Sequence, residues 1–216
     1  MSANLDVRAF GIAGMLGVAW FAAALLLMHA AAGSGLDWTR HYVSQFANGP
    51  RGWLLALGTF GHAAGNFALG LGLHRSLRGG ALRTWASGLF LLAAGGFALT
   101  GLVTVEPPGA AASFAGAVHR TSASASFVLE LAALVLFSAA FARRAPGGGM
   151  ARVSLALSAL AAAASATLLV AILLEWRQGL AERAALAAFM AWEFWAAWQL
   201  AGVCARLERH LPDNPR

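Results

Sequence analysis

Six long apolar stretches run through this sequence of 216 residues and constrain its fold more than any other feature. A helix needs ~20 mostly apolar residues to cross ~30 Å of hydrocarbon, and each stretch is long enough. The predicted fold class is therefore all-α: a polytopic membrane protein with a six-helix bundle, forming one integral membrane domain over residues 1–216. We expect its spans near residues 9–32, 52–74, 84–105, 115–142, 153–175 and 184–205.

The connectors between these stretches are short and rich in Gly and Pro, which are typical of turns. The longest, at about residues 33–51, has room for no more than a short interfacial helix. Residues 30–34 resemble a signal-peptide cleavage site, but the apolar core before them exceeds the ~7–15 residues of a signal peptide, so we expect this span to remain. Small residues predict close helix packing in the first two spans: Gly11, Gly14, Gly17, Gly61 and Gly65.

Charged residues are scarce, and this excludes several kinds of chemistry. Only 11% of the residues are charged, against ~25% in a soluble domain. All 15 basic residues are Arg, so no Lys can form a Schiff base with a chromophore or pyridoxal cofactor. The single cysteine, Cys204, excludes an intrachain disulfide and a cysteine-based metal cage.

The arginines predict the orientation in the membrane. Cytoplasmic loops collect Arg and Lys, and ten of the 15 arginines fall on one side of the predicted spans. We therefore expect a multi-pass protein of the cell (inner or cytoplasmic) membrane with both termini in the cytoplasm. The arginines are scattered over short loops rather than gathered on one face, so we predict no nucleic-acid partner. The ten are Arg8, Arg75, Arg78, Arg83, Arg143, Arg144, Arg152, Arg206, Arg209 and Arg216.

Polar side chains inside the spans are the first candidates for function, because a charge near the bilayer centre costs ~2.5–3.5 kcal/mol. Counting ~1.5 Å per residue from the outer ends places His62 level with Glu193, and Asn66 level with Glu130. His62 and Asn66 are four residues apart and share one helix face. Such groups can also simply link helices, at ~0.6–2 kcal/mol per contact, and this alternative stays open.

The fourth span carries a polar stripe. His119, Ser122, Ser126 and Glu130 are separated by 3, 4 and 4 residues and therefore lie on one face. The stripe starts at the outer surface and ends near mid-membrane, which is typical of a wetted cleft or a hydrogen-bonded seam. Arg120 lies beside its outer end, where it could hold an anionic headgroup or a carboxylate.

Three tryptophans in the sixth span point to a possible partner face. Trp192, Trp195 and Trp198 cluster on one side of the helix, and Glu193 lies ~160° from the middle of that cluster. We expect the tryptophans to face lipid or another membrane protein, and Glu193 to face inward. The acid–base pairs at the outer end of this span, such as Glu182 with Arg183, are of a kind that is usually solvated.

The outer loops supply further candidates: Asp37, His41, Ser44 and Glu106. The first three have the residue types of a nucleophile triad, but a triad is recognised by geometry rather than by composition. His62, His119, Glu106 and Glu193 are chemically able to bind a metal, yet no HExxH-type spacing supports such a site. His62 and His119 differ by ~9 Å in depth, which disfavours bis-histidine haem, and we predict no cofactor.

Several loop motifs resemble a known family. They are residues 37–46, Gly49-Pro50-Arg51-Gly52-Trp53, Val105-Glu106-Pro107-Pro108, and Gly116 with His119. Together they are similar to a prokaryotic family of six-span membrane proteins, the domain of unknown function 998, although that family more often has Phe-Pro and an Asp where this chain has Val-Glu-Pro-Pro. The resemblance implies a six-helix fold and an outward-facing polar site near Ser44, Glu106 and His119, and it implies no established activity.

The sequence therefore favours an outward-facing intramembrane cleft that binds a lipid or small molecule. An accessory or assembly subunit of a larger membrane complex, bound through the tryptophan face, is one alternative. A membrane-embedded hydrolase or a proton-coupled carrier that uses His62, Glu130 and Glu193 is another.

Overall fold

The computed structural model describes residues 2–30, 35–77, 80–144 and 148–208. Within these residues the chain forms six α-helices and one short 3-10 helix, and no strand. The all-helical prediction is confirmed, and each predicted span falls on one helix. The elements are α1 (Ser2–Ala30), η1 (Val43–Asn48), α2 (Trp53–Ser76), α3 (Ala81–Leu102), α4 (Phe114–Arg144), α5 (Gly149–Leu173) and α6 (Gln178–Glu208).

The predicted turns at residues 33–34, 78–79 and 146–147 lie outside the described residues, as do Arg209 and Arg216. The short helix expected in the first connector is present as η1. The loop between α3 and α4 is extended and turned, as its two consecutive prolines require.

Helices α1 to α5 are long and apolar enough to cross a membrane, which makes this a multi-pass membrane protein. Helix α6 is less apolar because it carries Glu193, Gln199 and three tryptophans. Its 31 residues would extend ~46 Å. That α6 forms the sixth span stays a prediction.

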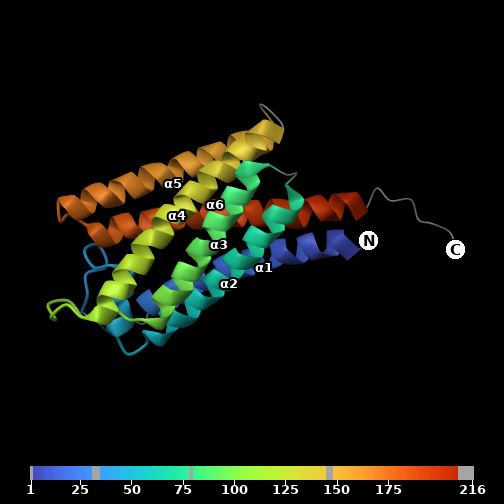
Figure 1. Ribbon diagram of the computed structural model, residues 1–216. Coiled ribbons are helices and arrows are strands. Elements are labelled where there is room, and N and C mark those ends of the chain that lie inside the picture. Colours follow the sequence, from blue (N-terminus) through green and yellow to red (C-terminus); the bar gives the residue numbers. More distant parts are fainter. Residues whose placement is uncertain (1, 31–34, 78–79, 145–147, 209–216) are drawn as a thin grey trace, which may run out of the picture.

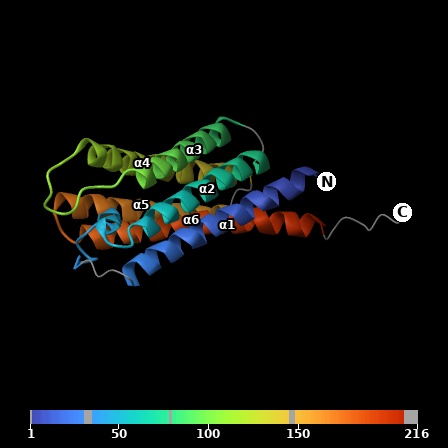
Figure 2. The ribbon, with the colours of Figure 1, turned by 90° about the horizontal axis from the view of Figure 1, so that it is seen from below.

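The helices form a closed ring in chain order (Figures 1 and 2). Each helix packs against the next one, α6 returns to pack along α1, and α2 also touches α6 across the ring. The start of α1 and the end of α6 lie at the same end of the bundle in both views. Which end faces the cytoplasm stays a prediction.

Glycines allow α1 and α2 to approach closely. A Cβ atom placed on Gly17 would lie 2.6 Å from the Cα atom of Gly65, and one on Gly14 would lie 3.2 Å from the Cβ atom of Leu69. The two backbones are therefore in direct contact, which agrees with the packing that the glycine spacing predicts. This contact fixes α2, the helix that carries His62 and Asn66.

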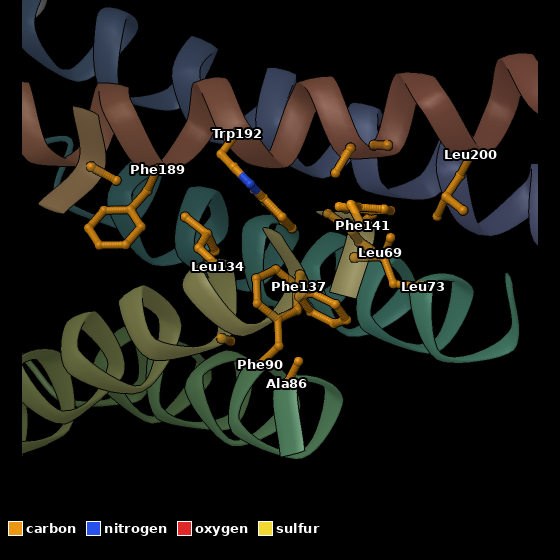
Figure 3. Packing of buried hydrophobic residues seen from close by; sticks show 14 of the residues in the cluster. Leu69, Leu73, Ala86, Phe90, Leu134, Phe137, Phe141, Phe189, Trp192 and Leu200 are labelled. Atoms are coloured by element: carbon orange, nitrogen blue, oxygen red, sulfur yellow. The ribbon is translucent and has the colours of Figure 1, made fainter. Parts of the chain in front are cut away.

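Trp192 lies in the core, which corrects the prediction that it faces lipid or a partner. Its side chain is 0% exposed and stacks on Phe137 with 5.9 Å between ring centroids. Figure 3 shows it reaching from α6 toward Phe137 and Phe90. Trp195 is partly buried and Trp198 is exposed. Because α6 packs against α5 on one side and α1 on the other, the adjacent residues Trp192 and Glu193 both point inward.

Candidate functional site

A cluster of polar side chains lies at the centre of the ring, and Glu193 is its best-paired member. The Nε2 atom of His62 is 2.8 Å and 3.1 Å from the two carboxyl oxygens of Glu193. The Nδ2 atom of Asn66, one turn along α2, donates to the same carboxyl group. All three side chains are fully buried. The structure thus joins His62 to Glu193, the pair that the depth count predicts.

Glu130 of α4 completes this cluster but is not paired in the same way. Neither of its carboxyl oxygens has a hydrogen-bond donor among the residues that the structure describes, and the side chain is 1% exposed. Glu193 is the acidic side chain that acts on Glu130 electrostatically. Two neighbouring carboxyl groups do not readily ionise together. Glu130, which has no donor, is therefore the member of the cluster that is able to hold a proton.

Asn66, predicted to lie level with Glu130, bonds to a different carboxyl group. Asn66 donates to Glu193 instead, and its Oδ1 atom has no partner among the described residues. A count of residues along a helix gives depth, but it does not give the direction in which a side chain points around the helix axis. In the ring, the α2 face that carries His62 and Asn66 is turned toward α6.

Aromatic side chains enclose the cluster. The ring of Phe21 stacks on the ring of His62 at 4.7 Å between centroids and 9° between planes. Phe97 lies 5.3 Å from the same imidazole ring. The Nδ1 atom of His62 has no partner among the described residues, and Nε2 is the ring nitrogen that faces the Glu193 carboxyl group. In an apolar enclosure, electrostatic interactions between the polar groups are strengthened.

The polar stripe of α4 forms a hydrogen-bonded seam with α3. Ser126 donates to the carbonyl oxygen of Ser122 at 2.8 Å, and the Ser122 hydroxyl lies 2.9 Å from that of Thr100 on α3. At the outer end, His119 Nδ1 lies 2.6 Å from the carbonyl oxygen of Val103. All three stripe residues are buried. The seam runs from the outer end of α4 inward to Glu130.

Arg120 and Glu106 form an ion pair at the N-terminal end of α4, with 2.6 Å between Nη1 and Oε2. The backbone N–H of Ser113 donates to the same carboxylate, and Gly116 leaves room for it because any side chain there would collide with Glu106. Hydrogen bonds from Ser113 and Arg120 lower the pKa of Glu106 to about 2. Arg120, predicted to hold a headgroup or a carboxylate, already holds this carboxylate of the chain itself.

Asp37, His41 and Ser44 are not arranged as a triad. The carboxylate of Asp37 accepts hydrogen bonds from the N–H and hydroxyl groups of Thr39, at 2.9 Å and 2.8 Å, and these bonds lower its pKa. His41 contacts the carbonyl oxygen of Asp37 rather than its carboxylate. Ser44, in η1, has no hydrogen bond to either residue among the described contacts.

The described residues include no group of three His, Cys, Asp or Glu side chains that could hold a metal ion. His62 and Glu193 lie in the central cluster, whereas Glu106 binds Arg120 in the outer loop and His119 contacts the end of α3. The four residues that could have formed a metal site are thus held in separate places.

A family model described as a protein of unknown function, DUF998, matches residues 15–199. The chain belongs to this family. The match includes Phe21, His62, Glu130 and Glu193, so every helix of the central cluster belongs to the DUF998 fold. No curated protein and no solved structure matches the chain.

The outward-facing site implied by the DUF998 resemblance is divided between two parts of the structure. Glu106 and His119 lie at the junction of α3 and α4. Ser44 lies in η1, which packs on α1, α2 and α6. A ligand that contacts both Ser44 and Glu106 would therefore have to extend across this end of the bundle.

The sequence pattern missed two polar contacts of this DUF998 chain. The hydroxyl group of Ser138 lies 2.6 Å from that of Ser154 and 2.7 Å from that of Ser158, and these contacts link α4 to α5. The two α5 serines are four residues apart in the sequence. That spacing, and the position of Ser138 eight residues after Glu130 on the stripe, were usable signals. Arg183, expected to be solvated, instead donates to His29 Nε2 at 3.0 Å and to the carbonyl oxygen of His41 at 3.0 Å.

Glu182 is the second charged residue that is not solvated as predicted. Its carboxyl group accepts the N–H of Val43 at 2.6 Å, so the first outer loop is fastened to the start of α6. Glu182 precedes the predicted span at 184–205. Burial raises its pKa to about 7, against the opposing effects of the Val43 hydrogen bond and the Arg183 charge. The signal was absent from the sequence, because 139 residues separate Glu182 from Val43.

Proposed function

We propose that this DUF998 protein is a proton-coupled membrane protein that binds a lipid or small molecule through an outward-facing polar cleft, with Glu130 as the group that exchanges its proton for the ligand. The observation that carries this proposal is the difference in hydrogen bonding between the carboxyl groups of Glu193 and Glu130. Glu193 accepts from His62 and Asn66, whereas both oxygens of Glu130 lack a donor among the described residues. A proton or a hydrogen-bond donor of a ligand is needed to complete the site.

Burial supports a neutral Glu130. An isolated carboxylate in an apolar interior is far more costly than a protonated carboxyl group, and no Arg lies against Glu130 among the residues that the structure describes. A protonated Glu130 can donate to Glu193, so that the two carboxyl groups together carry one negative charge. A ligand with an ammonium or hydroxyl group could take the place of that proton.

The α4 seam is the proposed route from the outer surface. Its hydroxyl groups bond mainly to carbonyl oxygens of their own helix, so they keep these partners if α3 moves away from α4. Gly96 of α3 lies directly against the Ser126 hydroxyl, without a side chain between them. The described arrangement is closed, and separation of α3 from α4 along this seam would open the cleft toward Glu130.

The proton is tested by infrared pH-difference spectra of the purified protein. We expect Glu182→Gln, which lacks the other carboxyl group of raised pKa, to keep a protonated-carboxyl band, and Glu182→Gln/Glu130→Gln to lose it. Glu182→Gln/Glu106→Gln is the matched control and should keep the band, because Glu106 binds Arg120 outside the central cluster. A band that persists in Glu182→Gln/Glu130→Gln would refute the proton site.

The ligand is tested by native mass spectrometry of the detergent-purified wild type, Glu130→Gln and Glu106→Gln proteins. We expect a bound lipid or small molecule on the wild type and Glu106→Gln that is depleted on Glu130→Gln. Equal occupancy on all three proteins would overturn binding at Glu130 while leaving the infrared result untouched.

The hydrolase alternative is not supported by the contacts. His62 Nε2 is bound to Glu193 and His62 Nδ1 has no partner, so no Ser, Thr or Cys among the described residues is activated by it. The accessory-subunit alternative is weakened because Trp192, a third of its proposed partner face, is buried in the core.

A further inference from the structure

We infer that the outer end of this protein binds the headgroup of phosphatidylethanolamine in the hollow between the first outer loop and the α5–α6 turn. This site uses residues that the central cluster does not, and it stands independently of the proton-coupled function. The hollow has a volume of about 280 Å³, near the lower edge of the ~300–1,000 Å³ typical of small-molecule sites. It is lined by Asp37, Thr39, Arg40, Glu175, Trp176 and Arg177.

Backbone contacts hold the two walls of the hollow together. The N–H of Leu180, at the start of α6, donates to the carbonyl oxygen of Thr39 at 3.0 Å. Gly179 packs against the carbonyl oxygens of Trp38 and His41 so closely that no side chain would fit. The hollow is therefore formed by two chain segments that are fixed to each other and not by one loose loop.

The charges around the hollow leave each other largely unpaired. Arg40 Nε lies 3.9 Å from Asp37 Oδ2, at the limit of an ion pair, and both side chains are exposed. Arg177 lies over the Trp176 ring at 5.6 Å, which is a contact with an aromatic face and not with an acid. The side chain of Glu175 has no hydrogen bond or ion pair among the residues that the structure describes, and only its backbone N–H donates, to the carbonyl oxygen of Ile172 at 3.2 Å. Two cations and two anions therefore border one hollow. Thr39 occupies Asp37 Oδ1, and the Asp37 Oδ2 atom, the Glu175 carboxylate and the two guanidinium groups keep unused hydrogen-bonding capacity.

A zwitterion with a phosphate and a primary ammonium group matches this set. Guanidinium groups bind phosphate oxygens through paired N–H donors, which Arg40 and Arg177 can supply. A primary ammonium group donates three hydrogen bonds, which Asp37 and Glu175 can accept. A quaternary ammonium group such as that of choline donates none and is recognised by aromatic cages. Only one aromatic ring lines the hollow, and Arg177 already covers it.

The surroundings place the hollow at headgroup depth. Trp38 and Trp176 are exposed beside it, and indole rings concentrate at the membrane interface. Leu173 and Leu174, which directly precede Glu175, are also exposed and offer an apolar surface to acyl chains. A membrane lipid satisfies both the charged hollow and this apolar surface, whereas a free headgroup satisfies only the first.

Native mass spectrometry with added phosphatidylethanolamine, phosphatidylglycerol or phosphatidylcholine tests the site. We expect the wild type to retain phosphatidylethanolamine about tenfold better than the other two lipids, equivalent to ~1.4 kcal/mol. Arg40→Gln/Arg177→Gln should remove this preference by weakening phosphate binding. Asp37→Asn/Glu175→Gln should lower phosphatidylethanolamine retention and raise that of the anionic phosphatidylglycerol.

Arg143→Gln/Arg152→Gln is the matched control, because it removes two arginines from the opposite end of the bundle and should leave the preference unchanged. All the substituted side chains lie at the protein surface, so a melting curve that matches the wild type verifies the fold of each variant. Equal retention of the three lipids by the wild type, or an unchanged preference in both hollow variants, would overturn the site. Binding of O-phosphoethanolamine as tightly as the lipid would refute the membrane ligand.

Discussion

Two buried polar groups sit on successive parts of α4 and differ in how completely they are paired. Ser138 lies 2.8 Å from the carbonyl oxygen of Leu134 and contacts Ser154 and Ser158 of α5. Trp192 of α6 donates to Ser154 at 3.0 Å, so three helices share one hydrogen-bonded group. Eight residues earlier on the same helix, Glu130 has no donor for either oxygen among the described residues.

The difference separates a structural contact from a site that is open to an occupant. The group formed by Ser138, Ser154 and Ser158 is neutral, and each hydroxyl has a protein partner. Its role is to join α4, α5 and α6. The Glu130 cluster leaves four buried polar atoms without a partner among the described residues, on His62, Asn66 and Glu130. Such atoms cost free energy in an apolar interior unless something else satisfies them.

Removal of the acceptor at the centre of the cluster should have the largest effect. We expect Glu193→Leu to destabilise the protein by ~3–5 kcal/mol, because His62 and Asn66 would be left buried without their common partner. Thermal unfolding in detergent measures the loss. The triple variant His62→Phe/Asn66→Leu/Glu193→Leu should recover most of it, since the two side chains that lose their acceptor are then replaced as well. A loss for Glu193→Leu no larger than that for Ser138→Ala would contradict the comparison.

Loss of the shared serine should have a smaller effect. We expect Ser138→Ala to cost ~1 kcal/mol, the typical net contribution of a hydrogen bond. Ser154 keeps Trp192 as a partner, and Ser158 keeps the carbonyl oxygen of Leu134 at 3.3 Å. The same melting curves measure this change, and the infrared carboxyl band should be unaffected. A change in that band would mean that the two groups on α4 are coupled.

Replacement of the unpaired acid should act in the opposite direction. We expect Glu130→Leu to leave stability unchanged or to raise it by ~1 kcal/mol, because an apolar side chain of similar size removes buried groups that have no donor. In the Glu182→Gln background it should also lose the protonated-carboxyl band. A large destabilisation would show that Glu130 is a fully bonded structural group, like Ser138, and would remove the distinction between them.

A separate effect, on the pH dependence of stability, concerns the start of α6. The pKa of Glu182 is raised by burial from its ordinary 4.5 to about 7, so the folded state favours its protonated form. Its stabilising contribution is full below pH 4.5, declines between 4.5 and 7, and is lost above 7. Glu182→Gln should flatten this decline in stability measured against pH. An unchanged slope would assign the pH dependence to another group.

Hydropathy was enough to predict the helices, because a span of ~20 apolar residues has few other stable arrangements in a bilayer. Depth was enough to bring His62 and Glu193 together. Direction around the helix axis was not predictable from one helix alone, as the Asn66 pairing shows. Trp192 was misplaced for a related reason. A helix with neighbours on two sides has two buried faces. The sequence of α6 places Trp192 and Glu193 on different faces, but it does not show that both faces are buried.

The outer contacts were beyond the reach of the sequence. The Arg183–His29 and Glu182–Val43 contacts join residues that are 154 and 139 positions apart. Short surface pairs such as Glu182 with Arg183 are normally solvated, and only the docking of the first outer loop over α6 changes that. The headgroup hollow has the same origin, since its two walls come from residues 37–40 and 175–177.

The paired carboxyl group on α6 has a consequence for biosynthesis. Glu193 opposes the entry of its own helix into the membrane by ~2.5–3.5 kcal/mol, the insertion cost of an acidic residue near the helix centre. The donors that offset this cost, His62 and Asn66, are on α2, which the ribosome completes more than 100 residues earlier. We therefore expect α6, the predicted sixth span, to enter the membrane by packing on α2 within an assembled bundle rather than through contact with lipid alone. Substitutions in α2 should then appear first as chains whose C-terminal helix has failed to integrate.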